Sequence, residues 1–189
     1  ALKSGYDPVT RYWPDWIRAT GFDPRLFPIV VPAGTKVTVH FDAKVNKDAI
    51  TVARLGHLVE EPNGLAFSPD ESVLYVSDTS AALRSDGGGH HHIVAFDVAG
   101  GQDLATPRVF AVVEPGLADG FRLDVHGFIY TSSADSVQVY HPDGTRIGRI
   151  PVPEKVGNLV FGGVGGNELF ICASTSLYRI TLNTRGATA

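Results

Sequence analysis

Short apolar runs separated by turns dominate the chain from about residue 63 onward. Stretches such as VLYV, HIVAFDV and SVQVY are rich in β-branched and aromatic residues, and the periodicity of an amphipathic helix is almost absent. The turns draw on 21 glycines and 12 prolines. Short strands bounded by such residues are typical of an all-β protein.

These strands form a repeat. Three segments align with one another: NGLAFSPDESVLYVSDTS from Asn63, DGFRLDVHGFIYTSSAD from Asp119 and GNLVFGGVGGNELFICAST from Gly157. A third strand follows each of them, and a fourth follows the first two, near RVFAVVE and RIGRIPV. Upstream, KVTVHFD and ITVARLG predict the last two strands of an earlier unit. Four antiparallel strands in about 40–45 residues form a β-propeller blade. The alternative, an unrelated β-sandwich, does not explain why strands and turns keep the same register.

Two polar residues occupy equivalent places in successive repeats. Asn63 and Asp119 each stand at the entry to the innermost strand of a blade, followed by a glycine. Both side chains should then reach one mouth of the central channel, where their oxygens would suit a hard cation such as Ca²⁺. The alternative is that Asn-Gly and Asp-Gly are simply turn dipeptides. The pattern alone leaves both interpretations open.

Composition and charge exclude several classes of function. A formal net charge of −4, without a Lys/Arg cluster, argues against a nucleic-acid binder. No apolar run approaches the roughly 18 residues that span a bilayer. The single cysteine, Cys172, excludes an intramolecular disulfide and is predicted to be a small buried hydrophobe within ELFICAS. The start of the chain has no apolar leader core, which favours the cytoplasm, while removal of a leader would allow a periplasmic or secreted protein.

Other candidate chemistry is weaker. The run His90, His91 and His92 is predicted to be a loop that enters a strand, distant from the strand entry at Asn63. Only His90 and His92 would share a face of that strand, and two imidazoles make a weak metal site. Asp78, in YVSDTS, is predicted to make structural hydrogen bonds. No GxSxG elbow is present to support a serine nucleophile.

Three stretches resemble the SMP-30/gluconolactonase/luciferin-regenerating family. They are PNGLAFSPDE, LADGFRLDVHGFIYTSSADSVQVYHPDG and IPVPEKVGNLVFGG with the following LFICASTSLYRI, within a match from about Lys36 to Asn183. The resemblance implies a six-bladed propeller with one divalent metal in its channel, most readily Ca²⁺, with Zn²⁺ or Mg²⁺ as alternatives. It also implies hydrolysis of lactones, commonly sugar lactones, or of related esters.

The resemblance also implies roles for individual residues. Asn63 matches the metal-binding Asn of an NGL motif. Asp119 matches the metal-binding Asp of a DG motif and is the candidate proton acceptor. Asn158, in VGNLVFGG, lies at the channel end of the last blade. For Asn158, a contact to metal, water or substrate and a simple strand-entry hydrogen bond both stay open.

The chain departs from the family pattern in three places. The EGP-x-W motif that supplies a metal-binding glutamate has no counterpart, and the SPND segment is absent. Six blades of about 45 residues need about 270 residues, whereas the 189 residues here supply about four. The sequence is then a piece of a longer protein, a shortened variant, or a chain whose copies associate through open blade edges to close the ring.

The predicted organisation is an N-terminal arm of unknown role, residues 1–21, followed by a propeller domain, residues 22–189. The arm is hypothesised to cover an open edge. Two functions remain. One is a metal-dependent lactonase, with reduced activity because one ligand is missing. The other is a non-catalytic propeller remnant that acts as a binding or assembly module.

Overall fold

The computed structural model describes residues 29–30, 38–39, 58–100 and 103–187. The chain divides into two compact units, residues 1–52 and 53–189. In the first unit, β1 (Ile29–Val30) pairs antiparallel with β2 (Thr38–Val39). The predicted arm, residues 1–21, and the predicted strand ITVARLG lie outside the described residues.

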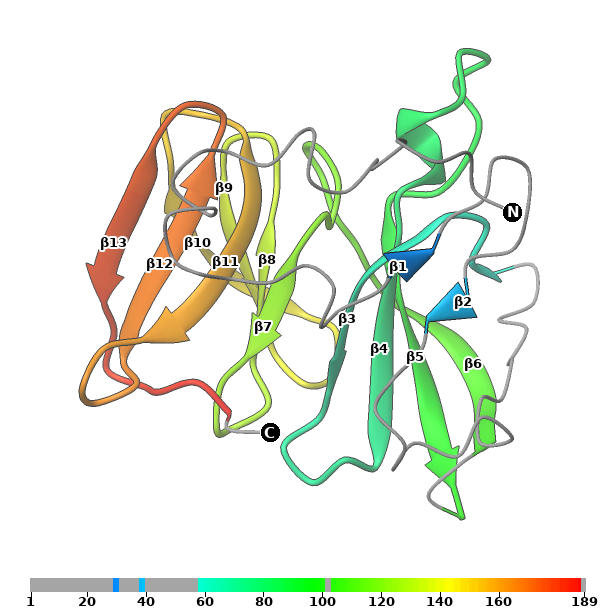
Figure 1. Cartoon of the computed structure of the whole chain (residues 1–189), viewed down its shortest axis with the longest axis horizontal. Coiled ribbons are helices and arrows are strands. Elements are labelled where there is room, and N and C mark those ends of the chain that lie inside the picture. The colour runs from blue at the N-terminus through cyan, green and yellow to red at the C-terminus, as the bar shows by residue number, and fades with distance from the viewer. Residues whose placement is uncertain (1–28, 31–37, 40–57, 101–102, 188–189) are drawn as a thin grey trace. The chain divides into compact units, whose positions relative to one another are not determined.

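The second unit consists of three antiparallel sheets (Figure 1). The first, in the order β3-β4-β5-β6, comprises Pro62–Phe67, Val73–Asp78, His92–Ala99 and Asp103–Val112. The second, β7-β8-β9-β10, comprises Phe121–Leu123, Ile129–Ser132, Ser136–Tyr140 and Arg146–Pro151. The third, β11-β12-β13, comprises Val156–Gly162, Glu168–Ala173 and Leu177–Thr181. One short 3₁₀-helix, η4 (Ser80–Ala82), follows β4. No helix among the described residues has the length and apolar character needed to cross a membrane.

The sequence pattern explains which strands lie inside. The middle strands β4, β5, β8 and β9 are mostly buried, and they carry the β-branched and aromatic runs. The outer strand β10 is mostly exposed and reads RIGRIP. The turn between β9 and β10 contains Gly144 at φ +88°, a left-handed conformation that glycine adopts readily.

Two hydrophobic cores fill the spaces between the sheets. One contains Tyr75 and Ile93 of the first sheet with Phe121 and Ile129 of the second. The other joins the second sheet to the third, and its buried members are Tyr130, Val137, Val152, Val156, Leu159, Leu169 and Ile171. The first strands of the sheets adjoin in order, because β3 contacts β7 and β7 contacts β11 (Figure 1). The all-β prediction and the succession of blade-like sheets are confirmed.

Candidate functional site

Asn63 and Asp119 meet where the first two sheets adjoin. Asn63 lies in β3, and Asp119 stands two residues before β7. The Asn63 Nδ2 donates a hydrogen bond of 2.5 Å to Asp119 Oδ1 and a longer one of 3.4 Å to Thr79 Oγ1. Asn63 is exposed and Asp119 is half-buried. The structure therefore brings together the two residues that occupy equivalent places in the repeat.

The glycines after these two residues permit a close approach between chain segments. A Cβ at Gly64 would lie 2.7 Å from the backbone oxygen of Asp119, and one at Gly120 would overlap the Asn158 amide. Neither glycine has a positive φ, and Gly64 lies within β3. Both glycines are therefore needed for space, and Asn63-Gly64 lies inside a strand and not in a turn.

A serine on the second strand of each of the first two sheets supports the glycine opposite it. Ser77 Oγ accepts a hydrogen bond of 2.7 Å from the Gly64 N–H. Ser132 Oγ accepts one of 2.8 Å from Asp119 N–H and one of 3.2 Å from Gly120 N–H. Both serines are buried. The repeat thus fixes the backbone behind Asn63 and Asp119 by the same means in both blades.

A polar hollow of about 350 Å³ opens beside this pair; its lining residues are Asn63, Asp119, Lys155, Gly157, Asn158, Cys172, Ala173 and Ser174. Asn158 lines it and uses its Oδ1 to accept a hydrogen bond of 2.8 Å from Leu159 N–H. The strand-entry bond is therefore present, and any contact of Asn158 with a ligand stays a prediction. Lys155 also lines the hollow, but the sequence analysis did not predict it. It lies just before β11, and no repeated motif marks its position.

Cys172 corrects one expectation. The thiol is exposed and lines the hollow instead of packing in the core. On β12, Leu169 and Ile171 turn toward the second sheet, so strand alternation turns Cys172 to the other face.

A second polar cluster lies at the same end of the first sheet. Pro62 pairs with Asp78, and Asp78 pairs with His92, so the three residues form one row across β3, β4 and β5. The expectation that the histidine run lies far from the entry at Asn63 is wrong. Two antiparallel steps return the chain to the end where it started, so β5 begins beside the entry to β3.

Asp78, His90 and His92 converge in this cluster. Their potential ligand atoms lie within 4.8 Å of one another. Asp78 also makes the structural hydrogen bonds that were predicted, accepting from Glu60 N–H at 2.6 Å and Ser80 N–H at 2.8 Å. Burial acts to raise the pKa of Asp78, but the N–H donors of Glu60, Ser80 and Glu61 outweigh it and hold that pKa below its ordinary value.

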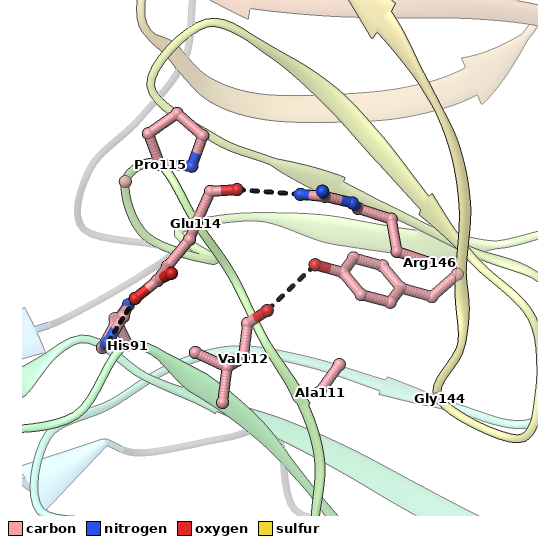
Figure 2. A pocket seen from close by; sticks show the side chains of 9 residues that line it. His91, Ala111, Val112, Glu114, Pro115, Gly144 and Arg146 are labelled. Atoms are coloured by element: carbon pink, nitrogen blue, oxygen red, sulfur yellow. Dashed lines mark hydrogen bonds and ion pairs between the residues drawn. The ribbon is translucent and has the colours of Figure 1, made fainter.

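A larger hollow, of about 900 Å³, lies where β6 leads toward the second sheet (Figure 2). Its polar groups bind one another. Arg146 donates to the Glu114 carbonyl at 2.9 Å, Tyr140 donates its hydroxyl hydrogen to the Val112 carbonyl at 3.1 Å, and His91 Nε2 lies 3.6 Å from the Glu114 carboxylate. The bonds of Arg146 and Tyr140 join β6 and its following loop to β10 and β9, so we interpret this hollow as a structural contact between sheets.

Several curated proteins are similar to this chain. The gluconolactonase of Zymomonas mobilis is 32% identical over an alignment of 139 residues, and the match covers 68% of this chain and 36% of that protein. Lactonohydrolase oryH of Aspergillus oryzae is 29% identical over an alignment of 141 residues, and the match covers 66% of this chain and 30% of that protein. Pentonolactonase XacC of Haloferax volcanii is 33% identical over 114 residues, 58% of this chain and 37% of that protein. The chain thus spans about a third of the length of the curated relatives it matches.

Several solved structures are also similar to this chain. A gluconolactonase of Xanthomonas campestris is 39% identical, with a TM-score of 0.56 over 65% of this chain and 38% of that one. A calcium-binding regucalcin of Agrobacterium tumefaciens, 20% identical with a TM-score of 0.55 over 69% of this chain and 48% of that one, shares the fold. The model of the SMP-30/Gluconolactonase/LRE-like region matches residues 38–175. With its blade-like sheets and the matching NGL and DG segments, this chain belongs to the SMP-30/gluconolactonase/LRE-like family and adopts part of a six-bladed-type β-propeller.

Proposed function

We propose that this chain functions as a metal-dependent hydrolase of lactones, with sugar lactones or related esters as substrates. The observation that carries the proposal is the contact between Asn63 and Asp119 at the mouth of the polar hollow. The names of the relatives, gluconolactonase and pentonolactonase, supply the substrate class.

The donor set suits a hard divalent cation, first of all Ca²⁺. A carboxylate and an amide oxygen are ligands of that class, at about 2.3–2.6 Å. Asn63 turns its NH₂ toward Asp119 in this structure. Rotating the amide by half a turn would place its oxygen beside the carboxylate. The amide oxygen and the carboxylate oxygen would then repel each other unless a cation lay between them. The same pair of side chains can therefore bond directly or share an ion.

Each residue has a distinct role in the proposed reaction. When bound, the cation would polarise the lactone carbonyl and stabilise negative charge on its oxygen. Asp119 would hold the cation and would also accept a proton from an attacking water, although a ligand role lowers its basicity. Asn63 would add an oxygen without adding charge. Asn158, on the wall of the hollow, would orient the substrate.

The alternative is a non-catalytic binding or assembly module. It is favoured by the absence of the family's EGP-x-W glutamate from the sequence. With two of the three family ligands, we expect a calcium Kd of about 1 mM or weaker. Turnover by the 189-residue chain should accordingly be slow and should need millimolar Ca²⁺.

The test is hydrolysis of gluconolactone as a function of Ca²⁺ concentration. Slow, calcium-dependent hydrolysis is expected, and Asp119→Ala should abolish it. Asp143→Ala is the matched control, because Asp143 belongs to another Asp-Gly pair but caps an exposed turn, where it accepts from Thr145 N–H. Loss of activity in both variants, or a hydrolysis rate that does not depend on Ca²⁺ concentration, would contradict the proposed site. Complete absence of hydrolysis would favour the binding module.

A further inference from the structure

The cluster at the start of β5 gathers nitrogen and oxygen donors from three points of the chain. Asp78 ends β4, His92 opens β5, and His90 lies in the loop between them. Asp78 is 0% exposed and His92 is 7% exposed. The three residues share no role with the proposed lactone site, and their chemistry differs from that of its oxygen pair.

Among the bonds of the described residues, the Asp78 carboxylate has one acceptor position left over for a ligand. Its Oδ1 accepts from Glu61 N–H at 3.3 Å and Ser80 N–H at 2.8 Å, and its Oδ2 accepts from Glu60 N–H at 2.6 Å. An ionised carboxylate offers about four acceptor positions, so one remains on Oδ2. The backbone bonds orient the carboxylate in the way that outer partners orient metal ligands.

His92 is held in the tautomer that a ligand needs. Its Nε2 lies 2.8 Å from the Leu58 carbonyl oxygen. A carbonyl oxygen only accepts, so Nε2 carries the hydrogen, and in the neutral ring the lone pair is then on Nδ1. A ring hydrogen donated to a backbone carbonyl is the usual second interaction of a metal-binding histidine.

His90 supplies the adjustable donor. Its ring stacks on that of His92, with centroids 4.5 Å apart and planes 15° from parallel. A metal lies in the plane of the imidazole that binds it, so one ring must turn before both can bind. The His90 side chain is 35% exposed, and its Nε2 lies 3.9 Å from the Glu60 carboxylate. Its backbone is anchored by a bond of 2.7 Å from its N–H to Ser80 Oγ, so the ring can turn without moving the chain.

We infer that Asp78, His90 and His92 form a binding site for a divalent transition metal of the Zn²⁺ class, with water as the fourth ligand. Two imidazoles and one carboxylate suit Zn²⁺, whereas the oxygen pair Asn63–Asp119 suits Ca²⁺. Bonds of about 2.0–2.2 Å require the donors to approach more closely than 4.8 Å, and rotation of His90 provides that movement. The ion would tie the loop before β5 to the backbone of Glu60 and Glu61.

The test uses the 189-residue chain stripped of metal with a chelator. Co²⁺ is the probe, because its visible absorption reports nitrogen and oxygen ligands in tetrahedral geometry, and Zn²⁺ competition then gives the affinity. His90→Ala should weaken binding at least about 100-fold, since loss of an outer partner alone costs about 10- to 100-fold. His91→Ala is the control, because the His91 Nδ1 pairs with the Val113 carbonyl instead, and its affinity should not change.

Two further measurements separate the outcomes. The double variant Asn63→Ala and Asp119→Ala should keep its Co²⁺ absorption, so failure of the lactonase proposal would leave this one standing. Circular dichroism of each metal-free variant shows whether it is folded, and Zn²⁺ should raise the melting temperature of the unaltered chain but not of His90→Ala. The inference is overturned if the folded chain binds no Co²⁺ at millimolar concentration, or if His90→Ala and His91→Ala bind it equally.

Discussion

The Asn63–Asp119 pair and the cluster of Asp78, His90 and His92 lie at the same end of the first sheet but are assembled differently. The pair joins the first two sheets, with Asn63 exposed and Asp119 half-buried. The cluster belongs to one sheet and its loop, with two of its three members buried. The pair therefore depends on how the sheets pack, whereas the cluster depends on how strands pair within a sheet. Substitutions at the contact between sheets should damage the pair first.

Phe121→Ala is expected to have the largest effect. Phe121 is fully buried between the first two sheets, and its ring lies 3.2 Å from the position of a Cβ at Gly64. Removing the ring leaves a cavity and should lower the free energy of unfolding by about 3–5 kcal/mol. Urea denaturation measures this loss. The calcium affinity of the folded fraction should fall while its Co²⁺ affinity is kept, and equal loss of both would mean that the two sites are not separable.

The sequence predicts the pair because its members hold equivalent places in a repeat. Stacking the segments from Asn63 and Asp119 places both residues at a strand entry, and the propeller arrangement then brings strand entries together. The strand predictions succeed for the same reason, since turn residues and β-branched runs recur in register.

The repeat does not predict the cluster of Asp78, His90 and His92, because the pairing of β4 with β5 brings its members together. Asp78 and His92 are adjacent only if β4 and β5 pair in the observed register, after a loop that contains η4 and Gly87–Gly89. Counting antiparallel strands could have placed them at the same end. The side-chain directions of His90 and the exposure of Cys172 depend on packing that no repeat encodes.

Gly64→Ala tests the contact between sheets more gently. The added Cβ would lie 2.7 Å from the Asp119 backbone oxygen, so the sheets must separate slightly. Such overpacking should cost about 2 kcal/mol, and calcium affinity should fall because Asn63 moves away from Asp119. Thermal unfolding and calcium titration measure the two effects. Gly148→Ala on β10 is the control, since a Cβ there meets nothing within 4 Å; comparable losses in both variants would contradict the steric explanation.

Ser132→Ala should also affect the Asn63–Asp119 pair and not the cluster, but less strongly than Gly64→Ala. Ser132 Oγ accepts from the N–H groups of Asp119 and Gly120, so its loss leaves two backbone donors without that partner. We expect a loss of about 1 kcal/mol in unfolding free energy and a weaker response to calcium, with Co²⁺ binding unchanged. Ser174→Ala, an exposed serine that lines the same hollow, is the control. If Ser174→Ala weakens calcium binding as much, Ser132 does not position Asp119.

Glu154→Gln should have the smallest effect, and its dependence on pH identifies the cause. The Glu154 carboxylate accepts hydrogen bonds from Ser176 Oγ at 2.5 Å, Tyr178 OH at 2.7 Å and Thr175 N–H at 2.7 Å. These donors lower its pKa from 4.5 to about 2. Because the folded-state pKa is the lower one, the ionised carboxylate stabilises the fold above pH 4.5, and that contribution is lost as the pH falls toward 2.

The difference in melting temperature between the unaltered chain and Glu154→Gln should therefore be present at pH 7 and shrink between pH 4.5 and pH 2. Glu154 precedes Lys155 on the wall of the hollow, so the substitution should also weaken the calcium response slightly at neutral pH. Co²⁺ binding should not change, because the cluster lies on the first sheet and Glu154 bonds to the third. A difference that stays constant down to pH 2 would show that shape, and not charge, makes Glu154 stabilising.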